Sequence, residues 1–236
     1  MSKIINFYET EKIKKRLPKF KDEQIQFTGM KLRSRILDCG SSGAGKTNLL
    51  YNYIYLTSQG KGTFKHVFLC YKTDEPLYDE IREQLKDKIT CFRDASDIPP
   101  VEIFPDNSND NFLFIFDDFV NEKDRLFNKK LQNYFAFGRK KGLTLFFLTQ
   151  SYYHTNKFVR DQCNYILLLS IKSEMDLARI ITEYEIPNIS KDQMIKMFDY
   201  CTQEPLNFMK ITTDRCKKEE KISKNFLEYL DPDEFK

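Results

Sequence analysis

The chain has 236 residues, 41% of them hydrophobic, and its 38 basic and 35 acidic residues give a formal net charge of +3. This is enough for one sizeable packed domain, and the near balance of charge excludes a strong overall field that would attract nucleic acid or an anionic membrane. Without a long apolar run or a signal-peptide pattern we expect no membrane span and no secretion, and the 6 widely spaced cysteines predict reduced core thiols rather than a zinc site.

The first half of the chain alternates predicted strands with predicted helices. Residues 1–30 are polar and mixed in charge, which indicates an N-terminal extension. Apolar runs predict strands at 33–39 and 65–71, and helical spacing of apolar residues predicts helices at 46–60 and 75–87. In the second helix Leu77, Ile81 and Leu85 are four residues apart, as on one helix face.

The second half continues the alternation after an irregular, proline-containing segment at 90–111. Buried strands are expected at 111–119, 143–149, 164–170 and, as the last strand, 205–212. Helices are expected at 128–138, 173–184 and 190–201, with a helical turn in the link before the 164–170 strand. Ser190 and Gln193 fit a capping box that opens the last helix.

Strands that are apolar on both faces and alternate with helices predict a mostly parallel sheet with helices on both faces. No linker or repeat divides the pattern, so we expect a single α/β domain at 31–212, followed by a charged C-terminal tail at 213–236.

The sequence Gly40-x-x-x-x-Gly45-Lys46-Thr47 matches the phosphate-binding loop and lies between a predicted strand and a predicted helix. Backbone N–H groups of such a loop surround an anion, the lysine reaches the β and γ phosphates, and the threonine hydroxyl is a ligand for Mg²⁺. We therefore predict a nucleotide site with ATP and Mg²⁺. The predicted nucleotide-binding residues are Gly40, Ser41, Ser42, Gly43, Ala44, Gly45, Lys46, Thr47 and Asn48.

Two acids end the "FLFIFDD" strand at the edge of the sheet where the phosphate loop is expected. There Asp117 can hold Mg²⁺ through water and Asp118 can orient the attacking water, although such a pair can also cap a helix. Gln150 ends the next strand, where an amide can sense a γ-phosphate or simply cap a loop. The residues alone leave both alternatives open for Gln150.

Other nucleotide-dependent classes fit less well. A GTP switch needs an Asn-Lys-x-Asp base reader, and Asn128-Lys129-Lys130-Leu131 lacks the aspartate. A small P-loop kinase needs an arginine-rich lid, and no compact arginine pair lies between Asp161 and Tyr200. An ATP-gated scaffold with little turnover is a third alternative, against which Asp118 and Gln150 argue.

Four stretches, "GSSGAGKTNLL", "FIFDD", "GRKKGLTLFFLTQS" and "FVRDQCNYILLLSIKSEMDLARII", resemble the FtsK–HerA superfamily of DNA translocases. The chain is most similar to the poxvirus-type genome-packaging ATPases of large DNA viruses and virophages. The resemblance implies a RecA-like P-loop NTPase fold in which the Gln150 strand lies between the phosphate-loop strand and the Asp117 strand. It places Gln150 at the γ-phosphate. Many superfamily members carry glutamate where this chain has Asp118, so the role of Asp118 is less secure than that of Asp117.

The resemblance also implies a homo-oligomeric ring, a pentamer or hexamer, that moves double-stranded DNA into a viral capsid. Each nucleotide would lie at a subunit boundary and meet an arginine of the neighbouring subunit, for which Arg139 is the first candidate and Arg160 the second. The expected location is the host cytoplasm or virus factory, with association to the virion. Basic clusters at 12–21, 139–141 and 217–224 are candidate DNA contacts, although surface charge is usually only solvated.

Overall fold

The computed structural model describes residues 6–19, 25–59, 63–119, 124–214 and 216–236. The α-helices within them are α1 (Glu11–Lys14), α2 (Ile25–Thr28), α3 (Lys46–Thr57), α4 (Pro76–Leu85), α5 (Arg125–Phe137), α6 (Lys157–Gln162), α7 (Glu174–Glu183) and α8 (Lys191–Thr202). The strands are β1 (Arg35–Cys39), β2 (His66–Cys70), β3 (Ile89–Phe92), β4 (Phe112–Asp117), β5 (Leu143–Thr149), β6 (Tyr165–Leu168), β7 (Met209–Thr212), β8 (Ile222–Lys224) and β9 (Glu228–Tyr229).

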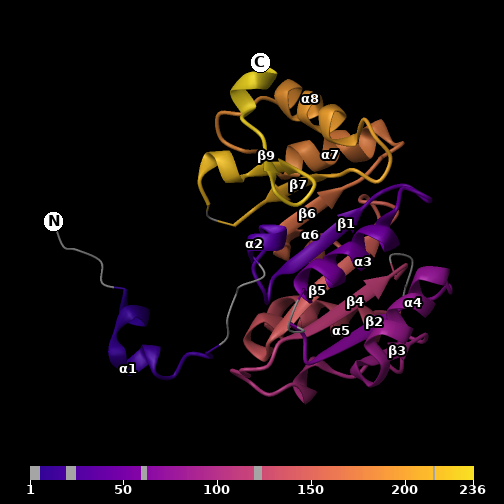
Figure 1. Cartoon of the computed structure of the whole chain (residues 1–236), viewed down its shortest axis with the longest axis vertical. Coiled ribbons are helices and arrows are strands. Elements are labelled where there is room, and N and C mark those ends of the chain that lie inside the picture. Colours follow the sequence, from indigo (N-terminus) through magenta and orange to yellow (C-terminus); the bar gives the residue numbers. More distant parts are fainter. Residues whose placement is uncertain (1–5, 20–24, 60–62, 120–123, 215) are drawn as a thin grey trace.

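The strands form one sheet in the order β3-β2-β4-β5-β1-β6-β7-β8-β9 (Figure 1). Pairing is parallel from β3 through β6 and antiparallel from β6 through β9. The predicted mostly parallel α/β sheet is therefore confirmed. Strand β5 lies between β1 and β4, as the family resemblance implies.

Helices cover both faces of the sheet, each over its own apolar layer. Successive residues of a strand point to opposite faces, so in β1 Ile36 belongs to one layer and Leu37 to the other. Helices α3 and α4 bury their apolar side chains in the layer of Ile36. Helices α5, α6, α7 and α8 bury theirs in the layer of Leu37. The prediction of helices on both faces is confirmed.

Aromatic rings fill much of the layer under α5. The ring of Phe114 in β4 is 5.1 Å from that of Phe68 in β2 and 4.5 Å from that of Tyr134 in α5, measured between centroids. Pairs at such distances add roughly 0.5–1.5 kcal/mol each beyond the apolar area they bury. This packing fixes β4 against α5 and thereby fixes the end of β4, where Asp117 lies.

The structure corrects two predictions about the extent of the sheet. Strand β3 begins at Ile89 and runs into the segment 90–111 that was expected to be irregular. The sequence did not indicate it, because its four residues are only half-buried and form no long apolar run. Strands β8 and β9 lie in the expected charged tail, so 205–212 does not hold the last strand. Ile222 pairs with Ile211 of β7 and is buried. The sequence did not indicate this strand, because charged residues lie close to Ile222 on both sides.

The N-terminal extension has two parts. The part with α1 stands away from the main body (Figure 1), and the segment meets the body at Lys19, whose N–H donates to the Asn109 side chain at 2.8 Å. Thr28 and Met30 are buried, and the Lys210 ammonium in β7 donates to the Thr28 carbonyl at 3.1 Å. The packed domain therefore includes residues just before the predicted boundary at 31. Residues 20–24 and 60 of the predicted segments lie outside the described residues.

None of the helices in the described part of the chain has the length and apolar character that crossing a membrane requires.

Candidate nucleotide site

The phosphate loop lies between the carboxyl end of β1 and the start of α3, as predicted. Gly43 and Gly45 have φ of 75° and 100°, a left-handed conformation that side chains with a Cβ rarely adopt. The Gly40 N–H donates to the Thr149 carbonyl at 3.2 Å, and the Ser41 N–H donates to the Ser170 carbonyl at 2.9 Å. The loop is thus bound to the ends of both strands that flank β1.

Lys46 begins α3 and folds back over the loop. Its ammonium donates to the carbonyls of Gly40 at 2.9 Å and Ser41 at 3.2 Å. The first N–H groups of a helix have no partner within the helix, so the loop and the first turn of α3 combine backbone donors with one positive charge. This arrangement is suited to binding a phosphate chain.

Thr47 and Asp117 are brought together by a residue that the sequence did not single out. The hydroxyl of Tyr78, in α4, donates to a carboxylate oxygen of Asp117 at the end of β4. The pKa of the same hydroxyl is raised above its ordinary range, first by burial and then by the charge of Asp117, while a hydrogen bond with Thr47 lowers it. Tyr78 therefore lies beside both predicted Mg²⁺ ligands.

Burial raises the pKa of Asp117 to about 6. The hydrogen bond from Tyr78 and the charge of Lys46 lower this pKa, and the charges of Glu75 and Asp118 raise it. Such a pKa marks a carboxylate that lacks enough positive charge nearby. A divalent cation bound by Thr47 and Asp117 would supply that charge, so the residues present fit Mg²⁺.

Asp118 and Gln150 lie at the same edge of the sheet. Asp118 has φ of 60°, so the backbone turns sharply after Asp117. Gln150 follows Thr149, whose strand pairs with Cys39 of β1, and its side chain is exposed. Both residues are placed at the edge that the sequence predicted. Their catalytic roles stay predictions.

Asp38 is a second residue that sequence reasoning missed. It lies in β1 with no exposed surface, and among the described residues neither of its carboxylate oxygens has a hydrogen-bond partner. Burial raises its pKa well above the ordinary value; Lys46 lowers it and Asp117 raises it further. The acid inside the apolar strand "RILDC" was the available signal. Tyr78 gave none, because 39 residues separate it from Asp117.

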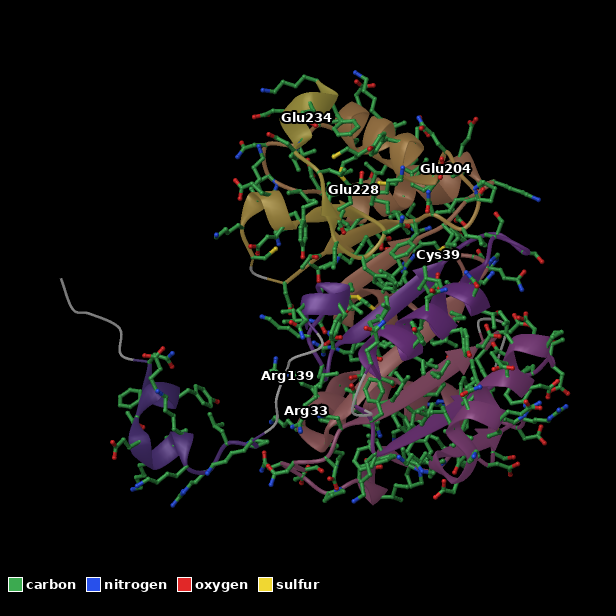
Figure 2. All side chains as sticks on the ribbon, in the orientation of Figure 1. Arg33, Cys39, Arg139, Glu204, Glu228 and Glu234 are labelled. Carbon is green, nitrogen blue, oxygen red and sulfur yellow. The ribbon has the colours of Figure 1, made fainter. Side chains whose placement is uncertain are left out.

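Arg139 lies at the opposite edge of the sheet. It is exposed in the turn Gly138–Lys141 that precedes β5, and its charge acts on Arg35 at the start of β1. Figure 2 shows Arg139 near Arg33, on the other side of the molecule from Cys39, where the phosphate loop begins. The seven residues of β5 separate the two edges by about 20 Å. Arg139 cannot reach the nucleotide site of its own chain.

The structure buries Arg160, the second candidate for the arginine that reaches a neighbouring subunit. It is only 2% exposed, and its guanidinium donates to the Tyr152 carbonyl at 3.1 Å. It also lies 4.5 Å from the centre of the Tyr152 ring and 3.4 Å from a carboxylate oxygen of Glu183. These contacts hold Arg160 inside the domain, where it supports the segment that follows Gln150.

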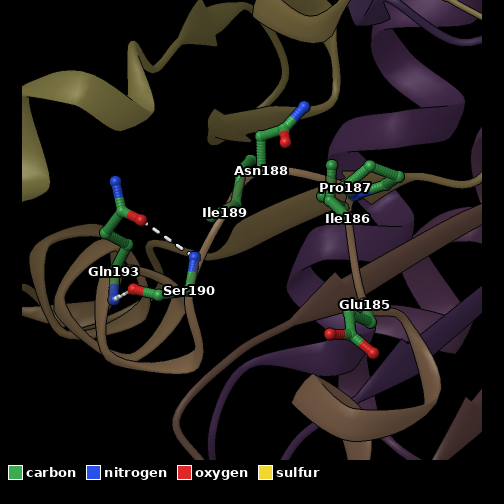
Figure 3. A pocket seen from close by; sticks show the side chains of 7 residues that line it. All are labelled: Glu185, Ile186, Pro187, Asn188, Ile189, Ser190 and Gln193. Atoms are coloured by element: carbon green, nitrogen blue, oxygen red, sulfur yellow. Dashed lines mark hydrogen bonds between the residues drawn. The ribbon is translucent and has the colours of Figure 1, made fainter.

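A hollow of about 660 Å³ lies away from the phosphate loop, at the turn between α7 and α8 (Figure 3). It contains the predicted capping box: the Gln193 N–H donates to the Ser190 hydroxyl at 3.2 Å, and the Ser190 N–H donates to the Gln193 side chain at 2.8 Å. The capping box is confirmed. Among the residues that the structure describes, Glu185 is the one ionisable residue that lines this hollow, so they form no cluster of catalytic groups there.

A known protein family matches the chain. A family model described as poxvirus A32 protein matches residues 93–223, which is more than half of the chain. No curated protein matches.

Solved structures share the fold at low identity. The genome packaging NTPase B204 from Sulfolobus turreted icosahedral virus 2, in complex with sulfate, is 15% identical with a TM-score of 0.61, covering 85% of this chain and all of B204. The same protein in complex with ATP-gammaS has a TM-score of 0.56 at 15% identity, over 82% of this chain and 97% of that one. EssC (ATPases 2 and 3) from Geobacillus thermodenitrificans has a TM-score of 0.56 at 10% identity, over 84% of this chain but 40% of that one.

Proposed function

Because this chain belongs to the family of poxvirus A32 proteins, which are viral packaging ATPases, we propose that it is an ATP-driven translocase that moves double-stranded DNA into a viral capsid. It works as a homo-oligomeric ring, a pentamer or hexamer, in the host cytoplasm or virus factory or bound to the virion. The observation that carries the proposal is the strand order β4-β5-β1, which brings Asp117, Gln150 and the phosphate loop to one edge of the sheet.

The phosphate loop binds the triphosphate of ATP. The Lys46 ammonium leaves the two loop carbonyls and donates to β and γ phosphate oxygens instead. The backbone N–H groups from Gly43 to Thr47 donate to the same phosphate groups. The Thr47 hydroxyl and the Asp117 carboxylate would hold Mg²⁺, which would supply positive charge to the phosphate oxygens.

The water that attacks during hydrolysis lies between Asp118 and Gln150. Asp118 polarises this water, whose oxygen attacks the γ phosphorus while the bond from phosphorus to the bridging oxygen breaks. The products are ADP and inorganic phosphate, and the proton of the water leaves through the Asp118 carboxylate. Gln150 donates to the γ-phosphate and senses its departure.

Arg139 completes the site of the neighbouring subunit. It lies about 20 Å from the phosphate loop of its own chain, so it acts only on a nucleotide bound by another copy. Its guanidinium neutralises charge on the transferring phosphoryl group, an effect of roughly a thousandfold or more in related chemistry. The ring is therefore required for turnover.

DNA is held through its phosphate backbone by exposed basic residues. Within the described residues, Lys141 is buried against the Phe104 carbonyl and Lys221 donates to the Asp214 carbonyl, which removes them as DNA contacts. The basic residues of 12–19, by contrast, are exposed on the segment that stands away from the body. These residues are our first candidates for gripping DNA.

The test is an ATPase assay with and without duplex DNA. We expect turnover that rises when duplex is added and falls as salt is raised, because phosphate contacts release counterions. Stimulation by a small phosphate acceptor instead would indicate a kinase. Binding of ATP without turnover, even with duplex present, would indicate a nucleotide-gated scaffold and overturn the proposal.

A further inference from the structure

The strand order also fixes the direction in which a bound nucleotide must run. Asp117 ends β4 and Gln150 follows β5. Both strands lie on one side of β1, and the two residues mark the γ-phosphate end. The nucleoside end must then leave the phosphate loop on the other side of β1, over the ends of β6 and β7. This step rests on the proposed function, since it takes the triphosphate to be bound with its γ end at Gln150.

A hollow of about 380 Å³ lies on that side. Its walls are the phosphate loop (Ser41–Ala44), Ser170 and Lys172 after β6, and residues 202–207 before β7. In Figure 2, Glu204 lies on the same side of the molecule as Cys39 at the end of β1. The hollow is therefore continuous with the loop that holds the phosphates and large enough for a nucleoside.

The walls are fastened to the loop. The Lys172 N–H donates to the Ser41 hydroxyl at 3.0 Å. The Leu206 side chain rests against Gly45 so closely that a Cβ on Gly45 would lie 2.5 Å from Leu206 Cδ2. Gly45 is thus required both for its backbone conformation and for this contact. Loop and hollow form one rigid surface.

Leu206 itself is held in an unfavourable backbone conformation. Its φ is 70°, in the left-handed region that residues with a Cβ rarely adopt. Its side chain is nevertheless 54% exposed, so burial of this leucine does not explain the strain. Strain of this kind concentrates where a side chain must be presented to a ligand.

The chemistry of the hollow suits a nucleoside. Leu206 and Pro205 offer apolar contact to the flat faces of a base, while Lys172, Gln203 and Glu204 offer polar groups to its edge and to the ribose hydroxyls. The Asn207 amide donates to Glu204 at 3.3 Å, which orients the carboxylate. We propose that residues 202–207 form the nucleoside-binding wall of this ATPase, with Leu206 as the contact to the base.

The experiment compares binding of ATP with binding of inorganic tripolyphosphate by calorimetry, without duplex. In Leu206→Ala we expect ATP to bind roughly tenfold more weakly and tripolyphosphate to bind within about twofold of the unchanged chain, because only the nucleoside contact is lost. Alanine keeps a Cβ, so the backbone strain is not relieved. Leu227→Ala, at a 44% exposed leucine outside the hollow, is the matched control and should change neither affinity.

Glu204→Gln provides a second variant that does not touch Gly45. It should also weaken ATP while leaving tripolyphosphate unchanged. If both ligands weaken equally in Leu206→Ala and neither weakens in Glu204→Gln, the segment only shapes the phosphate loop and the inference is wrong. If ATP is unaffected in both variants, the nucleoside lies elsewhere. Failure of the unchanged chain to bind either ligand would instead contradict the proposed function.

Discussion

The two edges of the parallel sheet carry opposite chemistry. At the carboxyl edge, two acids, Asp117 and Asp118, accompany a phosphate loop that has one lysine. At the amino edge, Arg35 and Arg139 lie close enough for the charge of one to lower the pKa of the other, with burial as the main cause of the low Arg35 pKa. One chain thus offers a nucleotide site at one edge and an unused arginine at the other. Under the proposed function, a complete site takes one edge from each of two copies.

The largest effect should come from removing the Arg139 side chain at the amino edge. Arg139→Ala should lower turnover about a thousandfold while leaving ATP binding unchanged, because the guanidinium acts only on the transferring phosphoryl group. Arg125→Ala, an exposed arginine at the start of α5, is the control. Mixing Arg139→Ala with Lys46→Ala subunits should restore part of the activity, since the Lys46→Ala subunit still supplies Arg139. Absence of rescue at every mixing ratio would remove Arg139 from the mechanism.

At the carboxyl edge, Asp118→Asn should keep ATP binding and lose turnover by about a hundredfold, because an amide cannot accept the proton of the attacking water. Single-turnover hydrolysis with bound ATP measures this step without product release. Asp97→Asn, an exposed acid remote from the loop, should behave like the unchanged chain. Unchanged hydrolysis in Asp118→Asn would mean that another group accepts the proton of the attacking water. Glu75 is the next candidate, because its charge acts on Asp117.

A smaller effect at the same edge should follow Tyr78→Phe. Loss of the hydroxyl removes the hydrogen bond that orients the Asp117 carboxylate, so the Mg²⁺ concentration at half-maximal ATPase activity should rise about tenfold, at the lower end of the 10-fold to 100-fold range typical of supporting residues. The maximal rate should change less. Tyr55→Phe, at a 62% exposed tyrosine of α3, is the control. An unchanged Mg²⁺ requirement would mean that the hydrogen bond has no part in holding the metal ligand.

The smallest effect concerns stability rather than turnover. The folded chain raises the pKa of Asp38, so the folded state keeps a proton that the unfolded state releases near pH 4. The contribution of Asp38 to the free energy of unfolding is therefore complete below that pH, and it decreases as the pH rises toward the pKa of Asp38 in the folded state. Asp38→Asn should flatten the decrease of Tm between pH 5 and 8, measured without nucleotide or Mg²⁺. An equal slope in both proteins would show that Asp38 is ionised in the fold.

The sequence was sufficient for the elements with strong local signals. Buried strands such as β5 and the loop around Gly45 follow from apolar runs and glycine spacing, and both lie where predicted. The order β4-β5-β1 came from the family resemblance, because strand order depends on contacts between distant segments. Tyr78 and the burial of Arg160 were beyond local patterns for the same reason: each depends on a contact between elements far apart in the chain, Tyr78 of α4 with the end of β4 and Arg160 of α6 with Glu183 of α7.

Both outer strands of the sheet are short: β3 has four residues and β9 has two. An adjoining copy therefore finds almost no free ladder of backbone donors and acceptors along which to add a strand of its own. Subunits that meet must do so through side chains on helices and turns, which can slide and separate during a cycle. Short outer strands therefore disfavour fibril formation by strand addition, even when many identical copies lie close together.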